Sequence, residues 1–358
     1  MNKLDDLKTI KKLDPAKVLE STQSLGKQIQ QAWGEFKKVK IPKDYKKVNQ
    51  ALINGMGGSG LPGHILRSVF AADLKIPCDV INSYQAPASL DKNTLYVFSS
   101  YSGSTEEPIS TFGQAKKMKA KLFAIGSGQN LASWVKQGKL PGYIFNAKFN
   151  PSNQPRMGLG YSLGASLALF NKLGLIKVSD LEIKKCLATI DRLQKKYGAQ
   201  NATKNNLAKQ LAVKMYGKMP VVVTSEFLAG NAHTFANQIN ENAKTFSNYF
   251  LIPELNHHLL EGLKFPKINK SNLFFIFFES KLYHPKNQVR YRVTQKVVAK
   301  NKIKVFAYKL SATSKLEQAF EMLLFGSYVS FYLAVLNNLN PSKIPWVDYF
   351  KKELKKIS

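Results

Sequence analysis

Cysteine is scarce in this chain. Among 358 residues there are two cysteines, Cys78 and Cys186, which lie far apart in sequence and outside any motif spacing. Such a pair provides no disulfide framework, so we expect the reducing environment of the cytoplasm. The first residues, Met1–Asp6, lack the apolar core of a signal peptide, which agrees with this expectation.

Long apolar runs are also missing. The longest strongly apolar stretch lies near Leu273–Phe278, well short of the ~20 residues that a membrane-spanning helix needs. We therefore expect no membrane partner. Hydrophobic residues make up 44% of the chain and charged residues 21%, which is typical of a globular protein. A chain of 358 residues is long enough for two domains of ordinary size.

Acidic residues and arginine are both few. Lysine and arginine total 53 against 23 aspartates and glutamates, which gives a formal net charge of +30. Only five of the basic residues are arginines, and the lysines are spread along the whole chain. Proteins that read base edges favour arginine, and proteins that follow the phosphate backbone cluster their charge. We therefore expect no nucleic-acid partner, although the positive field should attract small anionic substrates.

What the chain does have is a serine-rich turn after a strand. The apolar run Leu95–Phe98 has strand composition, and a helix-like segment begins at Pro108. Residues 99–105 between them contain five serines or threonines and one glycine. A strand that ends in such a loop and turns into a helix presents N–H groups, hydroxyls and the positive end of the helix dipole to one point. A phosphate is the natural occupant.

A second turn of this kind strengthens the interpretation. Gly55–Gly60 follows the strand Ala51–Asn54 and is also a glycine-rich turn from strand to helix. An ordinary serine-rich turn with a helix N-cap would explain the first turn alone. Two such turns at the carboxyl ends of strands in one half of the chain favour a shared anion site.

Strand and helix signals alternate between residues 46 and 150. The expected strands are Gln50–Asn54, Asp79–Asn82, Thr94–Phe98, Lys121–Ile125 and Gly142–Asn146, and the expected helices are Leu61–Ala72, Pro108–Met118 and Asn130–Lys136. This order predicts an α/β fold with a doubly wound parallel sheet, in which ligands bind at the carboxyl ends of the strands.

The same alternation of strand and helix signals returns after residue 217. The expected strands there are Val221–Thr224, Leu273–Phe278 and Lys304–Tyr308, at offsets of roughly 170–180 residues from three strands of the first half, which indicates one fold unit used twice. In the second copy, Ser225–Leu228 and Glu279–Lys281 replace the glycine and serine turns. Only the first copy is therefore expected to bind phosphate.

The second half carries a different set of polar residues. Glu241 lies among amide side chains in Asn237–Lys244, and a cluster follows that contains Glu254, His257, His258 and Glu261. A glutamate and a histidine in one pocket could act as base and proton shuttle, although either residue alone could belong to a solvated helix face. The cluster could also be read as metal ligands, but no further ligand at an informative spacing completes the set. We expect no metal and no cofactor.

Together these segments resemble a known family. Gly55–Gly60, Ser99–Glu107, Gln154–Tyr161, Asn240–Lys244 and Glu254–His257 are similar to motifs of the bifunctional phosphoglucose/phosphomannose isomerases of the sugar-isomerase (SIS) domain superfamily. The segment Leu13–Trp33 also resembles theirs, so the likeness covers nearly the whole chain. It implies interconversion of glucose 6-phosphate or mannose 6-phosphate with fructose 6-phosphate, a reaction of glycolysis and gluconeogenesis, by a homodimer with shared active sites.

The resemblance also implies two doubly wound SIS domains with flanking helices. The expected boundaries are an N-terminal helical segment at 1–45, a first SIS domain with the phosphate-binding loops at 46–176, a helical linker at 177–216, a second SIS domain at 217–340 and a C-terminal helical tail at 341–358.

The resemblance assigns roles to individual residues. Ser100, Ser102 and Thr105 would bind the phosphate, and Gly58 and Ser59 would line the sugar side. Glu241 would move a proton between C1 and C2 through a cis-enediol(ate) without a metal, and Arg156 would stabilise the enediolate. His257, donated by the partner subunit, would open the sugar ring, helped by a lysine near the C-terminus. Lys351 is the best match for that lysine, with Lys352 as the alternative.

Two other functions remain open. SIS domains also serve as non-catalytic phosphosugar-binding regulators, but such sensors usually carry an added DNA-binding or nucleotide module, which residues 1–45 do not show. Retention of Glu241 and Arg156 favours the enzyme. An amidotransferase-type isomerase that makes an aminosugar phosphate would need a glutaminase domain, for which this sequence shows no segment.

Overall fold

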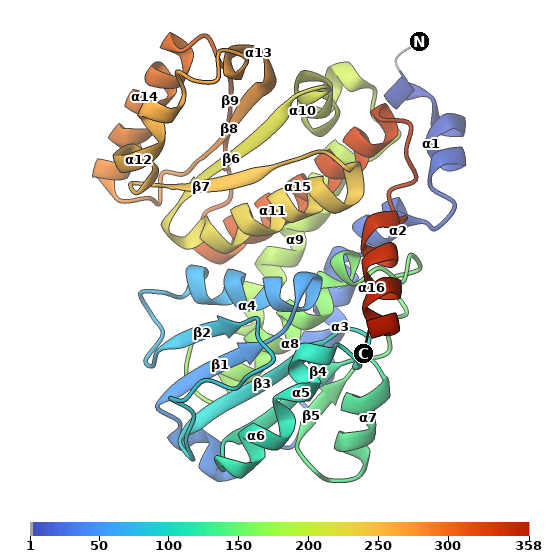
Figure 1. Ribbon diagram of the computed structural model, residues 1–358, viewed down its shortest axis with the longest axis vertical. Coiled ribbons are helices and arrows are strands. Elements are labelled where there is room, and N and C mark those ends of the chain that lie inside the picture. Colours follow the sequence, from blue (N-terminus) through green and yellow to red (C-terminus); the bar gives the residue numbers. More distant parts are fainter. Residues whose placement is uncertain (1–2, 358) are drawn as a thin grey trace.

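The computed structural model describes residues 3–357, which form two parallel β-sheets with helices around them (Figure 1). The strands are β1 Gln50–Asn54, β2 Cys78–Ile81, β3 Thr94–Ser100, β4 Lys121–Gly126, β5 Gly142–Ile144, β6 Met219–Ser225, β7 Asn248–Ile252, β8 Leu273–Glu279 and β9 Lys304–Lys309. Neighbouring strands are parallel throughout. The predicted α/β fold with doubly wound parallel sheets is thus confirmed.

Helices cover both sheets. They are α1 Leu7–Leu13, α2 Val18–Gln23, α3 Leu25–Phe36, α4 Gly57–Val69, α5 Glu106–Ser110, α6 Phe112–Lys117, α7 Gln129–Lys136, α8 Leu159–Lys172, α9 Asp180–Tyr197, α10 Leu207–Met215, α11 Ala229–Ala243, α12 Leu255–Gly262, α13 Asn269–Asn272, α14 Pro285–Lys300, α15 Lys315–Leu336 and α16 Pro345–Ile357. A short 3₁₀ turn, Pro155–Met157, precedes α8.

The two sheets repeat one strand order. The first sheet has the order β2-β1-β3-β4-β5, and the second has β7-β6-β8-β9. In a doubly wound sheet, ligands bind where this order reverses, beyond the carboxyl ends of the two central strands. The glycine turn follows β1 and the serine turn follows β3. Both turns therefore lie at the reversal point of the first sheet, and at the carboxyl ends of strands as the sequence predicted.

Strand prediction succeeds where burial is complete. Every residue of β3 is buried, because helices on both faces of a parallel sheet select continuous apolar runs. β7 is absent from the sequence prediction. It is an edge strand whose first residue is exposed and whose next three are only half-buried, so it lacks the strong apolar signal of the central strands.

The expectation of no long apolar segment is wrong for α15. This helix of 22 residues contains an 18-residue stretch with the length and composition of a membrane span, but 94% of that stretch is buried inside the protein. It packs against α9, α10 and α11. A core helix that is surrounded by other helices is apolar all round for the same reason as a membrane helix.

Close packing of α4 against α11 joins the helices of the two sheets. A methyl group on Gly230 of α11 would overlap the backbone of His64 in α4, so the two helix backbones touch at this point. Only glycine permits so close an approach. The contact fixes α11, and with it Glu241, relative to the loops of the first sheet.

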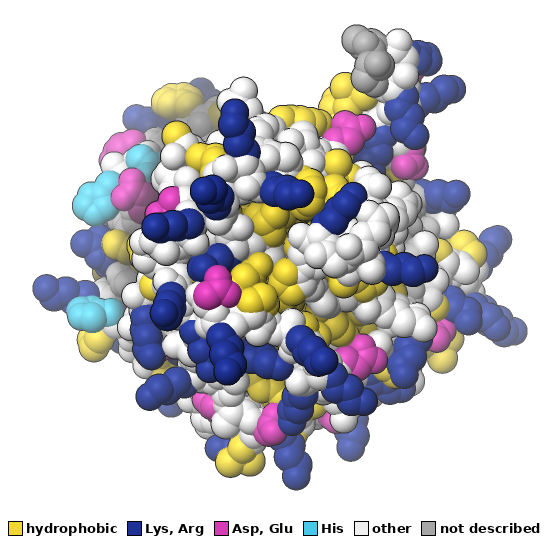
Figure 2. All heavy atoms as spheres, turned by 90° about the horizontal axis from the view of Figure 1, so that it is seen from below, with side chains coloured by type: hydrophobic (Ala, Val, Ile, Leu, Met, Phe, Trp, Pro, Cys, Tyr) yellow, Lys and Arg dark blue, Asp and Glu magenta, His cyan; other side chains and the backbone are white. Residues whose placement is uncertain are grey.

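Lysine side chains are spread over the surface. On the face shown in Figure 2, lysines and arginines are scattered among other residues and do not form one patch. Ion pairs such as Lys37–Asp180 and Arg67–Asp79 join exposed side chains and contribute little to stability. The pair Arg156–Glu241 differs, because the arginine side chain is only 2% exposed.

Candidate active site

The serine turn after β3 forms a loop held by its own hydroxyls. Ser100 is 1% exposed, accepts a hydrogen bond from the Gly103 N–H at 3.0 Å, and shares a 2.7 Å hydrogen bond with the hydroxyl of Thr105. Gly103 has φ +77°, and a methyl group there would overlap the Gly128 carbonyl oxygen. Ser102 is exposed. The loop therefore presents Ser102 to solvent and uses Ser100 partly to shape itself.

The glycine turn joins this loop to Arg156. A methyl group on Gly58 would lie 2.8 Å from the backbone nitrogen of Arg156, so the two backbones touch. Ser59 is 5% exposed, and its hydroxyl accepts a hydrogen bond from the Tyr101 N–H at 2.9 Å. Ser59 thus ties the two loops together. The structure brings Gly58, Ser59, Ser100 and Arg156 into one continuous site.

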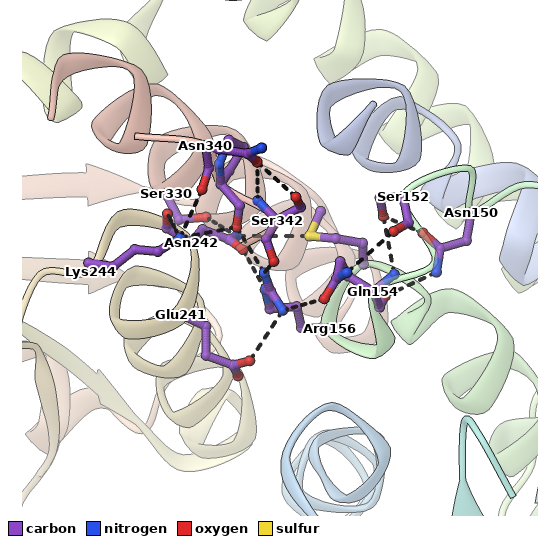
Figure 3. A network of polar contacts seen from close by, with 12 residues as sticks. Asn150, Ser152, Gln154, Arg156, Glu241, Asn242, Lys244, Ser330, Asn340 and Ser342 are labelled. Atoms are coloured by element: carbon purple, nitrogen blue, oxygen red, sulfur yellow. Dashed lines mark hydrogen bonds and ion pairs between the residues drawn. The ribbon is translucent and has the colours of Figure 1, made fainter. Parts of the chain in front are cut away.

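Arg156 is the centre of the network in Figure 3. Its Nε donates to the Asn242 side chain at 2.7 Å, and its Nη1 donates to Gln154 at 3.0 Å and to Glu241 at 3.5 Å. Its Nη2 donates to the backbone carbonyls of residues 341–342 at 2.8 and 3.0 Å. These contacts use all five N–H groups of a guanidinium. The fork of Arg156 is therefore fixed in one orientation.

Glu241 projects from the last turn of α11 toward Arg156. Its side chain is 30% exposed, so it is accessible to a small ligand. Burial raises the pKa of Glu241, and the positive charges of Arg156, Lys244 and Lys351 oppose that rise without cancelling it. A carboxylate with a raised pKa at a partly desolvated position is suited to accept a proton from carbon.

Several residues of the network were not among the predicted site residues. Asn242 is fully buried, accepts from Arg156 and donates to the Ser330 hydroxyl on α15 at 3.0 Å. Lys244 donates to backbone carbonyls of the segment that leads to α16. Burial and the charge of Arg156 lower the pKa of Lys244 to about 8, against the influence of Glu241. The amide-rich sequence around Glu241 was the available signal for Asn242.

The C-terminal helix brings a lysine to this site. Of the two candidate lysines, Lys351 is the one whose charge acts on Glu241, and Asp348 on the same helix acts on Arg156. Both residues belong to α16. Arg156 and Glu241 therefore come together from distant parts of the chain, and the exposed Lys351 acts on Glu241 through its charge.

We predict that Lys351→Met moves the acid limb of the kcat/KM profile to higher pH. As the expected base, Glu241 must be ionised to accept a proton, so activity should fall as pH drops through its pKa. Lys351 holds that pKa down. Loss of this partly screened charge should therefore move the limb to higher pH. Lys352→Met is the matched control and should leave the limb in place. Equal shifts in both variants would contradict the assignment of Lys351.

His257 lies away from these residues within one chain. It is exposed on α12, which follows the end of β7. Glu241 lies near the start of β7, because Asn240 bonds the backbone of Ser247 there. The five residues of β7 separate the two positions, roughly 16 Å at the usual rise per residue. The structure therefore does not bring His257 to Glu241 of the same chain.

The alternative metal cluster around His257 gains no support. Within residues 3–357, no group of three or more histidine, cysteine, aspartate or glutamate side chains is placed to hold a metal ion. Glu254, His257, His258 and Glu261 are all exposed.

Known proteins resemble this chain over nearly its whole length. Residues 204–354 match the family model for the bacterial phosphoglucose isomerase C-terminal SIS domain. A bifunctional phosphoglucose/phosphomannose isomerase of Caldicellulosiruptor bescii is 32% identical over 345 residues, which cover 95% of this chain and 99% of that protein. A protein of the same name from Thermoplasma acidophilum is 30% identical and covers 85% of this chain and 89% of its own length.

A solved structure supports the fold independently of sequence. A hypothetical protein from Thermus thermophilus matches with a TM-score of 0.75 at 15% identity, covering 98% of this chain and 93% of that one. At this identity the match shows the fold alone. The family assignment therefore rests on the relatives that are similar in sequence.

Proposed function

The chain belongs to the bifunctional phosphoglucose/phosphomannose isomerase family and is a phosphosugar isomerase, and we propose that it interconverts glucose 6-phosphate and mannose 6-phosphate with fructose 6-phosphate. The observation that carries this proposal is the pairing of an accessible carboxylate, Glu241, with the fixed cation of Arg156 beside the serine loop. Proton abstraction next to a carbonyl needs such a base and such a cation.

The proposed mechanism moves one proton between neighbouring carbons. Glu241 takes the proton from C2 of the open-chain aldose phosphate, the C–H electron pair forms the C1=C2 bond, and the carbonyl pair moves onto O1. Arg156 stabilises this cis-enediolate. Glu241 then returns the proton to C1, and the O2 hydroxyl proton passes to O1, which leaves the ketose. The long Nη1 contact between Arg156 and Glu241, 3.5 Å, is the one that an enediolate oxygen would replace.

The phosphate is assigned to the serine loop. Ser100, Ser102 and Thr105 would hold it, with Gly58 and Ser59 on the sugar side. Support comes from the position of the loop at the reversal point of the first sheet and from the glycine turn, which touches the backbone of Arg156 through Gly58 and bonds to the loop through Ser59. The domain boundaries at 46–176 and 217–340, and a cytoplasmic location, remain part of this proposal.

We further propose a homodimer in which His257 of one subunit serves the other subunit's site. The support is its separation from Glu241 within one chain and its exposure on α12. An imidazole at the substrate would open the cyclic sugar by transferring protons between the ring oxygen and the anomeric hydroxyl.

A mixing experiment tests the shared site. Glu241→Gln and His257→Ala subunits, each inactive alone, should regain activity on cyclic substrate after subunit exchange, because one intact site forms in each heterodimer. Subunit exchange is verified by mass, and self-mixing of each variant is the control. Absence of rescue after verified exchange would contradict donation of His257 across an interface.

The proposed activity itself is tested by a coupled assay. Purified protein should convert fructose 6-phosphate to both glucose 6-phosphate and mannose 6-phosphate, and the rates should survive prolonged treatment with EDTA because side chains alone move the proton. Binding of fructose 6-phosphate without turnover to either aldose would leave a phosphosugar-binding regulator as the function. Activity that EDTA removes and a divalent metal restores would contradict the mechanism.

A further inference from the structure

Lys244 adopts a backbone conformation that favours glycine. It ends α11 with φ +50° and ψ +38°, the left-handed region. Glycine is preferred at the ends of helices in this conformation because other residues pay a steric cost there. Lys302 shares this conformation, so the contacts of the Lys244 side chain, and not its backbone alone, decide whether it has a role.

The side chain of Lys244 contacts the segment that precedes α16. Its Nζ donates to the carbonyl oxygens of Asn340 at 3.0 Å, Pro341 at 3.4 Å and Asn242 at 3.2 Å. Arg156 donates to the carbonyls of Pro341 and Ser342. Three consecutive carbonyls, those of residues 340–342, thus accept hydrogen bonds from two cations, as Figure 3 shows.

This anchor matters because α16 is largely exposed along its length. The helix begins at Pro345, and its apolar side chains are largely in solvent: Trp346 is 80% exposed, Tyr349 58% and Phe350 61%. A helix with an exposed apolar face gains little stability from packing. The segment at its N-terminal end, which Lys244 and Arg156 hold, is therefore one of the contacts that fix its position.

We propose that Lys244 is a positioning residue that anchors Asn340–Ser342 and thereby holds α16, with Lys351, beside Glu241. The inference rests on the proposed function to the extent that Lys351 acts in the reaction. The charged groups around Lys244 fit this role: Glu241 lies one turn earlier on α11, and Arg156 shares the Pro341 carbonyl with it. Lys244 attracts Glu241 and repels Arg156, so its charge also helps to set where both lie.

The test compares three variants. Lys244→Gly removes the side chain and relieves the backbone, so it should fold with an unchanged or higher Tm. Lys244→Arg keeps the charge and the donors. Lys302→Gly is the matched control, because Lys302 is an exposed lysine with φ +61° outside the site.

Two readouts are needed, amide hydrogen exchange over residues 345–357 and steady-state kinetics. Lys244→Gly should speed exchange in α16 and lower kcat by ~10–100-fold, the effect of displacing a catalytic group by about 1 Å, with KM little changed. Lys244→Arg should restore slow exchange and most of kcat. Lys302→Gly should match the wild type in both.

The proposal is overturned if Lys244→Gly leaves exchange in α16 unchanged, whatever happens to kcat. Faster exchange with an unchanged kcat would also overturn it, because the position of α16 would then not matter to the reaction. If the wild-type protein proves inactive, the exchange measurement still decides whether Lys244 holds α16. Failure of the proposed function and failure of this inference are thus distinguishable.

Discussion

Replacing Glu241 by glutamine is expected to lower kcat for fructose 6-phosphate by ~10²–10⁴-fold, the usual contribution of a positioned general base. Glutamine keeps the shape of the side chain and can still contact Arg156, but it cannot accept a proton. The Kd for fructose 6-phosphate should stay within a few-fold, because the serine loop of the first sheet holds the phosphate. The measurement is steady-state kinetics with calorimetric binding on the same preparation.

Glu261→Gln is the control for this variant. Glu261 is an exposed glutamate on α12 and a member of the alternative metal cluster, so its replacement makes the same chemical change away from Arg156. It should leave kcat unchanged. A Glu241→Gln protein with near-normal turnover would remove Glu241 from the mechanism, and a large loss in Glu261→Gln would redirect attention to the cluster around His257.

The second large effect is expected in the serine loop. Ser100→Ala combined with Thr105→Ala should raise KM for fructose 6-phosphate. Each charge-assisted hydrogen bond to phosphate is worth ~1.5–3 kcal/mol, so the double variant should raise KM by roughly 10²–10⁴-fold. The effect on kcat should be smaller, because Glu241 and Arg156 are untouched.

The structure shows why the double variant is the sharper test. The hydroxyls of Ser100 and Thr105 share a hydrogen bond, so a single alanine variant would leave the other hydroxyl unpaired, whereas the double variant removes both. The Gly103 N–H still loses its acceptor on Ser100, which calls for a Tm measurement beside the kinetics. Ser110→Ala, an exposed serine one helix turn beyond the loop, is the control. An unchanged KM in a stable double variant would contradict the assignment of the phosphate to this loop.

The sequence was most informative about short-range features. Central strands such as β3 are easy to predict because complete burial demands a continuous apolar run. Glycine and serine turns are equally local, since Gly103 needs a left-handed backbone and Gly58 a close approach to Arg156. The apolar character of α15 was harder to predict. Polar residues interrupt its apolar sequence, and only the structure shows that they belong to one buried helix.

Long-range juxtapositions could not be predicted from residue patterns. Arg156 and Glu241 are 85 residues apart, and Arg156 reaches Ser342 across 186 residues. Only the packing of α11 against α4 and the return of the chain after α15 bring these groups together. Lys244 could not be recognised as a site residue for the same reason, because its partners include a backbone carbonyl 96 residues away that carries no sequence signature.

The central claim is that Glu241 moves a proton between C1 and C2 of a phosphorylated hexose. Its most direct test is to incubate the protein with fructose 6-phosphate in D₂O and to analyse the aldose phosphates by NMR. The account predicts that glucose 6-phosphate and mannose 6-phosphate both form and carry deuterium at C2, at least in part, and that Glu241→Gln forms neither while still binding substrate. A Glu241→Gln protein that still forms either aldose phosphate at the wild-type rate, or a wild-type protein that binds fructose 6-phosphate without turning it over, would contradict it.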